Sequence, residues 1–241
     1  LNADDETFCE DVKTTEEYRH LRRTVPSTIW NAEFQQEPIE ATGTLFVKTE
    51  LQRFSIKTLT ARLAEVGADT KPILLTDGRL GYIDVADEGD DYLAFPIGYI
   101  IGKDVFITDF LFTPSTIDVT APLCVDKINT HAIDYTRVET NNQGGGFMRE
   151  LHHLGVAREK LLKVNNIQNK HTRILMEYGF IKEHFHFIQA DELPQGCPYD
   201  LALEQICDYP KQGRKKRVDA PDALAGLSKF IRSMFKHIFG E

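Results

Sequence analysis

In Arg79-Leu80-Gly81-Tyr82-Ile83-Asp84-Val85-Ala86-Asp87-Glu88-Gly89-Asp90-Asp91, a short apolar run carries one carboxylate and is followed by a cluster of acids. The run contains β-branched and aromatic residues next to glycine, which is typical of a buried strand. Burying the carboxylate of Asp84 costs free energy unless it is paired or binds a cation. The acids around Gly89 indicate a turn, and the apolar residues from Tyr92 onward predict an antiparallel second strand. Taken alone, the segment fits the solvated end of a hairpin equally well.

The chain of 241 residues has the composition of a globular protein, and its length allows one large domain or two small ones. It contains no apolar run of membrane-spanning length and no signal-peptide pattern at its start. Because it does not begin with methionine, we expect a fragment of a longer protein. The four cysteines form no CxxC pair, which favours a reducing compartment and argues against a disulfide framework and a zinc finger.

Charge is distributed unevenly along the chain. The net charge of −9 does not by itself indicate a nucleic-acid-binding protein, but residues 211–217 form a strongly basic segment. A segment of this kind is most often a solvated loop. Its position just before Asp219 makes it a candidate for contacts with phosphates. The basic residues concerned are Lys211, Arg214, Lys215, Lys216 and Arg217.

The order of the predicted elements indicates the fold class. We expect strands at 80–86, 92–101 and 104–112, and Pro96 predicts either an edge position or a bulge for the second. Alternating helices and strands follow, at 120–132, 135–139, 144–155, 161–164, 169–179, 184–188, 199–207 and 221–239. Ahead of them we expect a helix capped by Thr14 or Thr15, a strand at 44–47 and a helix at 56–66 that ends at Gly67.

Three antiparallel strands followed by alternating helices and strands predict an α/β protein with a mixed sheet flanked by helices on both faces. The order β-β-β-α-β-α-β-α is that of the ribonuclease H-like fold. In this arrangement the strand that carries Asp84 lies beside the strand that ends at Glu139. The last helix crosses behind them and brings Asp219 or Asp222 to the same place.

Clustered carboxylates repel one another unless cations lie between them, and such oxygen ligands suit Mg²⁺ or Mn²⁺. Two ions about 4 Å apart activate a water and stabilise the leaving oxygen of a phosphodiester. The four acids therefore predict a two-metal site. Each has a simpler explanation: Asp219 or Asp222 could cap the last helix, and Glu139 could end its strand in solvent.

Several patches, in their order and spacing, resemble the C-terminal nuclease part of the terminase large subunit of tailed bacteriophages. They are residues 30–38 with 43–46, 81–91, Val138-Glu139-Thr140-Asn141, Asn169-Lys170 with Arg173, and 219–225. The resemblance implies a metal-dependent endonuclease that cuts concatemeric double-stranded viral DNA when packaging starts and ends. It implies that Asp84, Glu139 and Asp219 bind metal and that Asp222 is a further acid nearby. Many relatives carry an acid where this chain has Val218, so the choice between Asp219 and Asp222 as the closer ligand stays open.

The family's full-length protein also carries a packaging ATPase. This chain has no GxxxxGK[ST] phosphate loop, so we expect no ATP hydrolysis. The resemblance implies that residues 1–42 are the connector or tail of an absent ATPase domain and that residues 43–241 are the nuclease domain. It also implies double-stranded DNA, the portal and the small terminase subunit as partners, no membrane, and action in the cytoplasm of the infected bacterial host.

Other residues leave alternatives open. Lys170 and Arg173 share one helical face and resemble a family feature that contacts DNA, but they could form a surface salt bridge. The histidines at 152, 153, 171, 184 and 186 match no complete set of zinc ligands. A non-catalytic DNA-clamping or motor-docking domain is the main alternative to the nuclease. Another enzyme of the same fold, such as a junction resolvase or a transposase, is a third.

Overall fold

The computed structural model describes residues 7, 11–25, 30, 43–64, 76–86, 92–140, 144–213 and 218–240. Its centre is a seven-stranded sheet with the strand order β1-β7-β4-β3-β2-β5-β6. The strands β2, β3 and β4 are antiparallel, whereas β5, β6, β7 and β1 each join a neighbour in parallel, so the predicted mixed sheet is confirmed. Their bounds are β1 Gln52–Phe54, β2 Gly78–Ile83, β3 Leu93–Ile101, β4 Asp104–Thr113, β5 Tyr135–Glu139, β6 Leu161–Val164 and β7 Phe185–Ile188.

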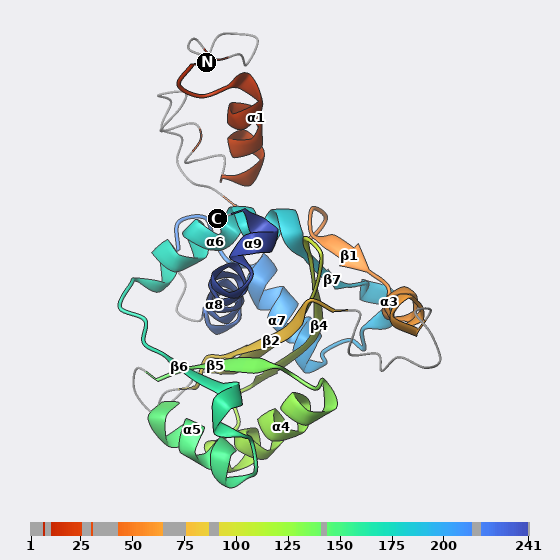
Figure 1. Ribbon diagram of the computed structural model, residues 1–241, viewed down its shortest axis with the longest axis vertical. Coiled ribbons are helices and arrows are strands. Elements are labelled where there is room, and N and C mark those ends of the chain that lie inside the picture. The colour runs from red at the N-terminus through yellow and green to blue at the C-terminus, as the bar shows by residue number, and fades with distance from the viewer. Residues whose placement is uncertain are drawn as a thin grey trace.

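Helices cover both faces of this sheet, as predicted (Figure 1). The helices α6, α7 and α8 lie on one face, where α8 packs against β2 and β3, and α4 and α5 lie on the other. Each face has its own apolar core. None of the described helices is long and apolar enough to cross a membrane. The bounds are α1 Thr15–Thr24, α3 Ile56–Ala64, α4 Ile117–Thr130, α5 Gly144–His153, α6 Lys170–His184, α7 Pro198–Cys207, α8 Asp219–Met234 and α9 Lys236–Phe239.

Small residues allow α8 to lie close to the sheet. The ring of Tyr82 on β2 occupies the space that a side chain at Gly226 would fill, since a Cβ there would lie 2.4 Å from the ring. Gly98 on β3 also faces α8, where a Cβ would lie at an ordinary contact distance of 3.5 Å from Leu227. The close contact holds α8 against β2 two turns after Asp219.

The strand β3 lies inside the sheet, between β4 and β2, so the edge position considered for the proline-containing strand is wrong. The bulge is confirmed: the register between β3 and β4 shifts between Ile97 and Gly98, one residue after Pro96. A proline cannot donate a backbone hydrogen bond, and an irregular ladder is where an internal strand accommodates it.

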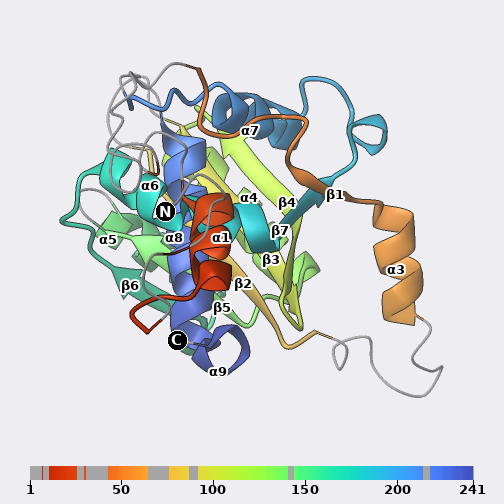
Figure 2. The ribbon, with the colours of Figure 1, turned by 90° about the horizontal axis from the view of Figure 1, so that it is seen from above.

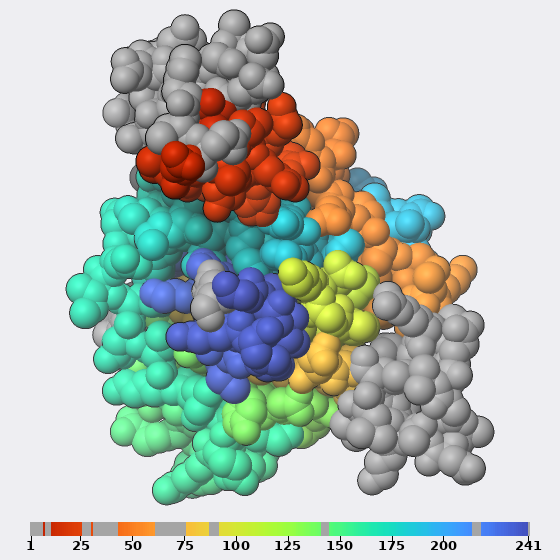
Figure 3. All heavy atoms as spheres, turned by 45° about the horizontal axis from the view of Figure 1, so that its top comes forward, coloured from red at the N-terminus to blue at the C-terminus, as the bar shows by residue number. Residues whose placement is uncertain are grey.

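Gly179 does not end α6, contrary to the sequence prediction. The helix continues to His184, and Gly179 faces the end of α1, where a Cβ would lie 2.5 Å from the carbonyl oxygen of Thr24. Figures 2 and 3 show α1 seated over this part of the molecule. The absence of a side chain at Gly179 therefore allows α1 and α6 to pack closely.

Other boundaries differ from the prediction. Residues 44–47 form only an isolated bridge, Thr44 to Pro210, and the strand in this region is β1. The last helix begins at Asp219 rather than Pro221, and Phe235 separates it from the short α9. Thr14 caps α1 and forms a capping box with Glu17, as expected. The acidic turn at 87–91 and the predicted helix end at Gly67 lie outside the described residues.

Candidate metal centre

Two of the predicted acids stand at the carboxyl ends of neighbouring parallel strands. Asp84 directly follows β2, where its backbone exchanges two hydrogen bonds of 3.0 Å with Ala94 of β3. Glu139 is the last residue of β5, and the preceding residue, Val138, pairs with Ile83 of β2. The predicted side-by-side position of these strands is confirmed, and it brings both acids to the same edge of the sheet.

The other two acids lie in the first turn of α8. Asp219 and Asp222 are three residues apart and therefore share one face of the helix. Neither caps it: the N-cap residue is Val218, and Gln205 of α7 accepts a hydrogen bond of 2.7 Å from the backbone N–H of Ala220. With that donor satisfied from another helix, both carboxylates are available to the site.

The carboxylates converge in a buried cluster. One oxygen each from Asp84, Glu139 and Asp222 lie within 4.8 Å of one another. Two oxygens bound to one ion are separated by at most twice the metal–oxygen distance, about 4–5 Å for Mg²⁺ or Ca²⁺, so this donor set fits a shared divalent cation. The three residues are between 2% and 8% exposed. Asp219, 4% exposed, lies beside the cluster and accepts a hydrogen bond of 3.3 Å from the backbone N–H of Tyr92.

Lys170, the first residue of α6, places its ammonium among these acids. Its Nζ lies 3.7 Å from Asp84, 3.5 Å from Asp219 and 3.6 Å from Asp222. Burial disfavours the ammonium, but the surrounding carboxylates outweigh burial and raise the pKa of Lys170 above its ordinary value. In the absence of metal, this ammonium is a counter-ion that links Asp219 to the rest of the cluster.

Arg173, one turn further along α6, is the second cation that contacts the acids. Its guanidinium binds Asp222 through two hydrogen bonds, Nε to Oδ1 at 3.0 Å and Nη2 to Oδ2, and Nη2 lies 3.9 Å from Glu139. Arg173 is 7% exposed, so the surface salt bridge considered from the sequence is wrong for it. Four carboxylates against Lys170 and Arg173 leave two negative charges uncompensated when all are ionised, which a divalent cation would balance.

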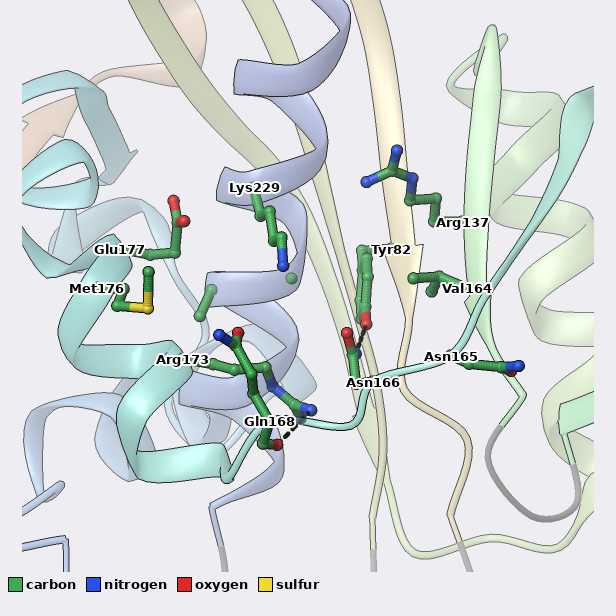
Figure 4. Close-up of a pocket in the computed structure, with 12 residues that line it drawn as sticks. Tyr82, Arg137, Val164, Asn165, Asn166, Gln168, Arg173, Met176, Glu177 and Lys229 are labelled. Atoms are coloured by element: carbon green, nitrogen blue, oxygen red, sulfur yellow. Dashed lines mark hydrogen bonds between the residues drawn. The ribbon is translucent and has the colours of Figure 1, made fainter.

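Sequence reasoning missed two residues that hold Glu139. The Tyr82 hydroxyl donates a hydrogen bond of 2.9 Å to Glu139 Oε2, and the Asn166 side-chain amide donates to the same oxygen at 2.9 Å. The Asn166 amide also donates to the tyrosine oxygen at 2.7 Å (Figure 4). Burial raises the pKa of Tyr82, so the phenol stays protonated as a donor. Tyr82 lies two residues before Asp84 on one strand, a spacing that shares a face of the sheet and could have indicated it.

The remaining sequence candidates do not enlarge the site. His152, His184 and His186 contact Val156, Lys103 and Asp104, respectively. Within the described part of the chain, no histidine belongs to a group of three potential metal ligands. The basic residues Arg214, Lys215, Lys216 and Arg217 lie outside the described residues.

The cluster predicts a pH dependence of stability without metal. Burial raises the pKa of Asp84 well above its usual range, and burial likewise raises the pKa of Asp222 in spite of Arg173. A carboxyl with a raised folded-state pKa favours folding while it is protonated. The free energy of unfolding therefore falls as the pH rises from about 4, the pKa of the carboxyl in the unfolded chain, through its higher pKa in the folded protein.

We accordingly expect metal-free Asp84→Asn to unfold at a higher urea concentration than the unsubstituted protein at pH 7. The gain should be about 1.4 kcal/mol for each unit by which the pKa of Asp84 is raised, and it should shrink towards pH 4. Urea unfolding of both proteins in chelator from pH 5 to 8 measures it. A difference that does not change with pH would contradict this assignment of the raised pKa.

Comparisons with known proteins are informative at the level of structure. No protein-family model matches the chain, and neither does any curated protein sequence. Among solved structures, the human cytomegalovirus terminase nuclease domain, soaked with manganese and bound to an inhibitor, matches with a TM-score of 0.53 at 11% identity. The match covers 78% of this chain and 95% of that domain.

The large terminase from the thermophilic bacteriophage D6E matches with a TM-score of 0.57 at 11% identity, over 92% of this chain and 52% of the phage protein. The chain thus spans about half the length of the D6E protein. At this level of identity the likeness concerns the fold. It agrees with the mixed strand order and with the helices on both faces of the sheet, and we conclude that this chain has the ribonuclease H-like fold of terminase nuclease domains.

Proposed function

We propose that the protein is the metal-dependent DNA endonuclease of a viral genome-packaging terminase, and that it cuts concatemeric double-stranded DNA by two-metal phosphodiester hydrolysis. The observation that carries the proposal is the buried group of Asp84, Glu139 and Asp222, whose oxygens lie within 4.8 Å of one another. Burying like charges this closely is costly unless a cation compensates them. Mg²⁺ and Mn²⁺ are among the ions that suit carboxylate ligands.

The proposal gives each residue a role. Asp84, Glu139 and either Asp219 or Asp222 would hold the ions, which supply an activated water and neutralise the leaving oxygen. Tyr82 and Asn166 orient Glu139 by donating to one of its oxygens. Arg173 fixes both oxygens of Asp222, which leaves the other acids to adjust to the ligand.

Contacts with DNA would come from cationic side chains around the cluster. Lys170 has a side chain that is 44% exposed, so we propose that it can turn from the acids towards a phosphate. The donors of Arg173 already serve Asp222 and the carbonyl of Gln168, so its part in binding DNA would be indirect. The basic segment 214–217 precedes α8 directly and is proposed to contact further phosphates.

The wider assembly follows from the same proposal. Residues 1–42 would connect to an ATPase domain, and residues 43–241 would form the nuclease domain. The full-length protein would work with the portal and the small terminase subunit in the cytoplasm of an infected bacterium. This chain would not hydrolyse ATP.

A non-catalytic DNA-clamping or motor-docking domain is the second candidate, and one observation favours it. Lys170 and Arg173 already neutralise half of the four acidic charges, which is how a structural cluster would be stabilised without metal. The endonuclease and the non-catalytic domain differ in whether the cluster binds a divalent cation and whether the protein cleaves DNA.

The first test is the metal dependence of DNA cutting. We expect the purified chain to nick and then linearise supercoiled plasmid in Mn²⁺ or Mg²⁺, and to leave it intact in chelator, because the acids alone provide no activated water. Gel analysis of a time course measures both products. An intact plasmid in every metal, with binding to the same DNA still measurable, would favour the clamp over the endonuclease.

A further inference from the structure

A small cavity lies directly beside the carboxylates, on the α8 face of the sheet. It has a volume of about 110 Å³ and is lined by α6, α8, β5 and the segment that follows β6 (Figure 4). Tyr82, Asn166 and Arg173 form the wall between this cavity and the acids, since each lines the cavity and also contacts Glu139 or Asp222. The cavity and the acid cluster are therefore adjacent compartments with a shared wall.

Its size restricts what can enter. A volume of about 110 Å³ is well below the roughly 300–1,000 Å³ of pockets for drug-sized ligands. It exceeds what a single water requires. Ala225 and Gly226 contribute little side-chain volume to its α8 wall. The space therefore suits a compact polar group rather than a nucleoside or a cofactor.

The lining contains two cationic side chains, half-buried Arg137 and exposed Lys229, that form no ion pair with a carboxylate of the described residues. Arg137 of β5 stacks on Phe230, with its guanidinium carbon 4.2 Å from the ring centroid, and donates a hydrogen bond of 3.1 Å to Ser233. Lys229 of α8 directs its ammonium towards the middle of the cavity (Figure 4). Within the described ranges, neither forms an ion pair with a carboxylate. Arg137 is thus held in place by neutral contacts, and its charge remains available.

The other charged groups of the lining are already compensated. The carboxylate of Glu177 accepts a hydrogen bond of 2.6 Å from Ser228 and one of 3.1 Å from Arg232. Arg173 is neutralised by Asp222 on the other side of the shared wall. The cavity therefore carries a net positive charge from Arg137 and Lys229, and its preferred ligand is a small anion.

We propose that this cavity binds a backbone phosphate of the DNA strand that is cut, next to the phosphate held at the acids, with Arg137 and Lys229 as its ligands. The proposal rests on the endonuclease function proposed above. A guanidinium presents paired donors that match phosphate oxygens, and an ammonium adds a second positive charge. Because the cavity shares a wall with the acid cluster, a strand bound there would be fixed in register relative to the scissile bond.

The test measures DNA binding in chelator, where no cutting takes place. The affinity of a short duplex for the full chain is followed against salt concentration for Lys229→Gln, Arg137→Gln and the unsubstituted protein. Each phosphate contact contributes about 0.9 to the slope of log affinity against log salt for B-DNA. Because both side chains contact the same phosphate, we expect each substitution to lower the slope by part of that amount and the double substitution to lower it by about 0.9, with binding weakened several-fold at low salt.

Two controls separate charge from packing. Lys103→Gln removes the same charge from the turn between β3 and β4, at the end of β3 opposite to Ala94 and Asp84, and should leave the slope unchanged. Arg137→Lys keeps the positive charge but loses the planar stacking on Phe230, and should retain the slope. Circular dichroism and urea unfolding confirm that each variant is folded.

Unchanged salt slopes for both Lys229→Gln and Arg137→Gln would overturn the proposal. Thermal stabilisation by inorganic phosphate tests the other source of the same ligand. If phosphate stabilises the protein through Arg137 and Lys229 while the DNA slopes stay the same, the cavity is a free-anion site and the DNA assignment fails. Reduced slopes in a protein that cuts no plasmid would support the phosphate site and refute the endonuclease, so the two failures are distinguishable.

Discussion

Asp84→Asn is expected to lower the rate of plasmid cleavage by about 100- to 1,000-fold, while the protein remains folded. Losing one preorganised electrostatic stabiliser of a transition state costs roughly 10²–10³ in rate, and Asp84 is the acid that faces both Glu139 and the first turn of α8. The asparagine keeps the size of the side chain but removes the charge that would hold a cation. Initial rates of linearisation in saturating Mn²⁺ measure the loss.

The matched control is Asp118→Asn, which makes the same change at an exposed position in the first turn of α4, on the other face of the sheet. It should cut at the unsubstituted rate. The same assay compares Asp219→Asn with Asp222→Asn, and we expect the larger loss for Asp222 because it shares the cluster with Asp84 and Glu139. Cleavage by Asp84→Asn at the normal rate would remove the acid cluster from the catalytic site.

Arg173→Met is expected to destabilise the metal-free protein by about 3–5 kcal/mol. Removing one partner of a buried ion pair leaves the other charge uncompensated, and here both Asp222 and Glu139 lose their guanidinium. Methionine approximates the length of the apolar stem, so the loss of packing is small. Urea unfolding at pH 7 in chelator measures the change, and added Mn²⁺ should narrow the difference because a cation replaces the missing charge.

Lys182→Met provides the comparison for an exposed ion pair. Lys182 lies 3.0 Å from Glu50 at the surface, and its loss should cost less than about 1 kcal/mol. Combining Arg173→Met with Asp222→Asn should recover part of the lost stability, because the uncompensated charge is removed together with its partner. A cost for Arg173→Met as small as that for Lys182→Met would show that the buried pair does not stabilise the fold.

The sequence predicted the framework of the site because the framework depends on local patterns. A carboxylate in a short apolar run placed Asp84 on a buried strand, although β2 ends one residue before it, and the order of strands and helices predicted that the strand of Glu139 lies beside it. These features rely on a continuous apolar run and on the order of the strands and helices, both of which can be read along the chain.

The groups that complete the site depend on contacts between distant segments. Asn166 and Tyr82 are 84 positions apart and meet only at Glu139. The sequence could not choose between Asp219 and Asp222, since both lie on one face of the same helical turn. Gly179 was predicted to end a helix because glycine disfavours helix interiors, and only the packing of α1 reveals why it is tolerated there.

The contact between Gly179 and Thr24 has a mechanical consequence. The helix α6 is continuous from Lys170 to His184. It contacts α1 at Gly179, and it also carries Lys170, whose ammonium lies among the acids. At 1.5 Å per residue, the two positions are about 13 Å apart along the helix axis. A helix of this length transmits an axial displacement with little compression. A pull or push on α1 that moves α6 along its axis would therefore shift Lys170 and Arg173 together relative to α8. Force applied to α1 would thus reach the acid cluster through the single helix α6.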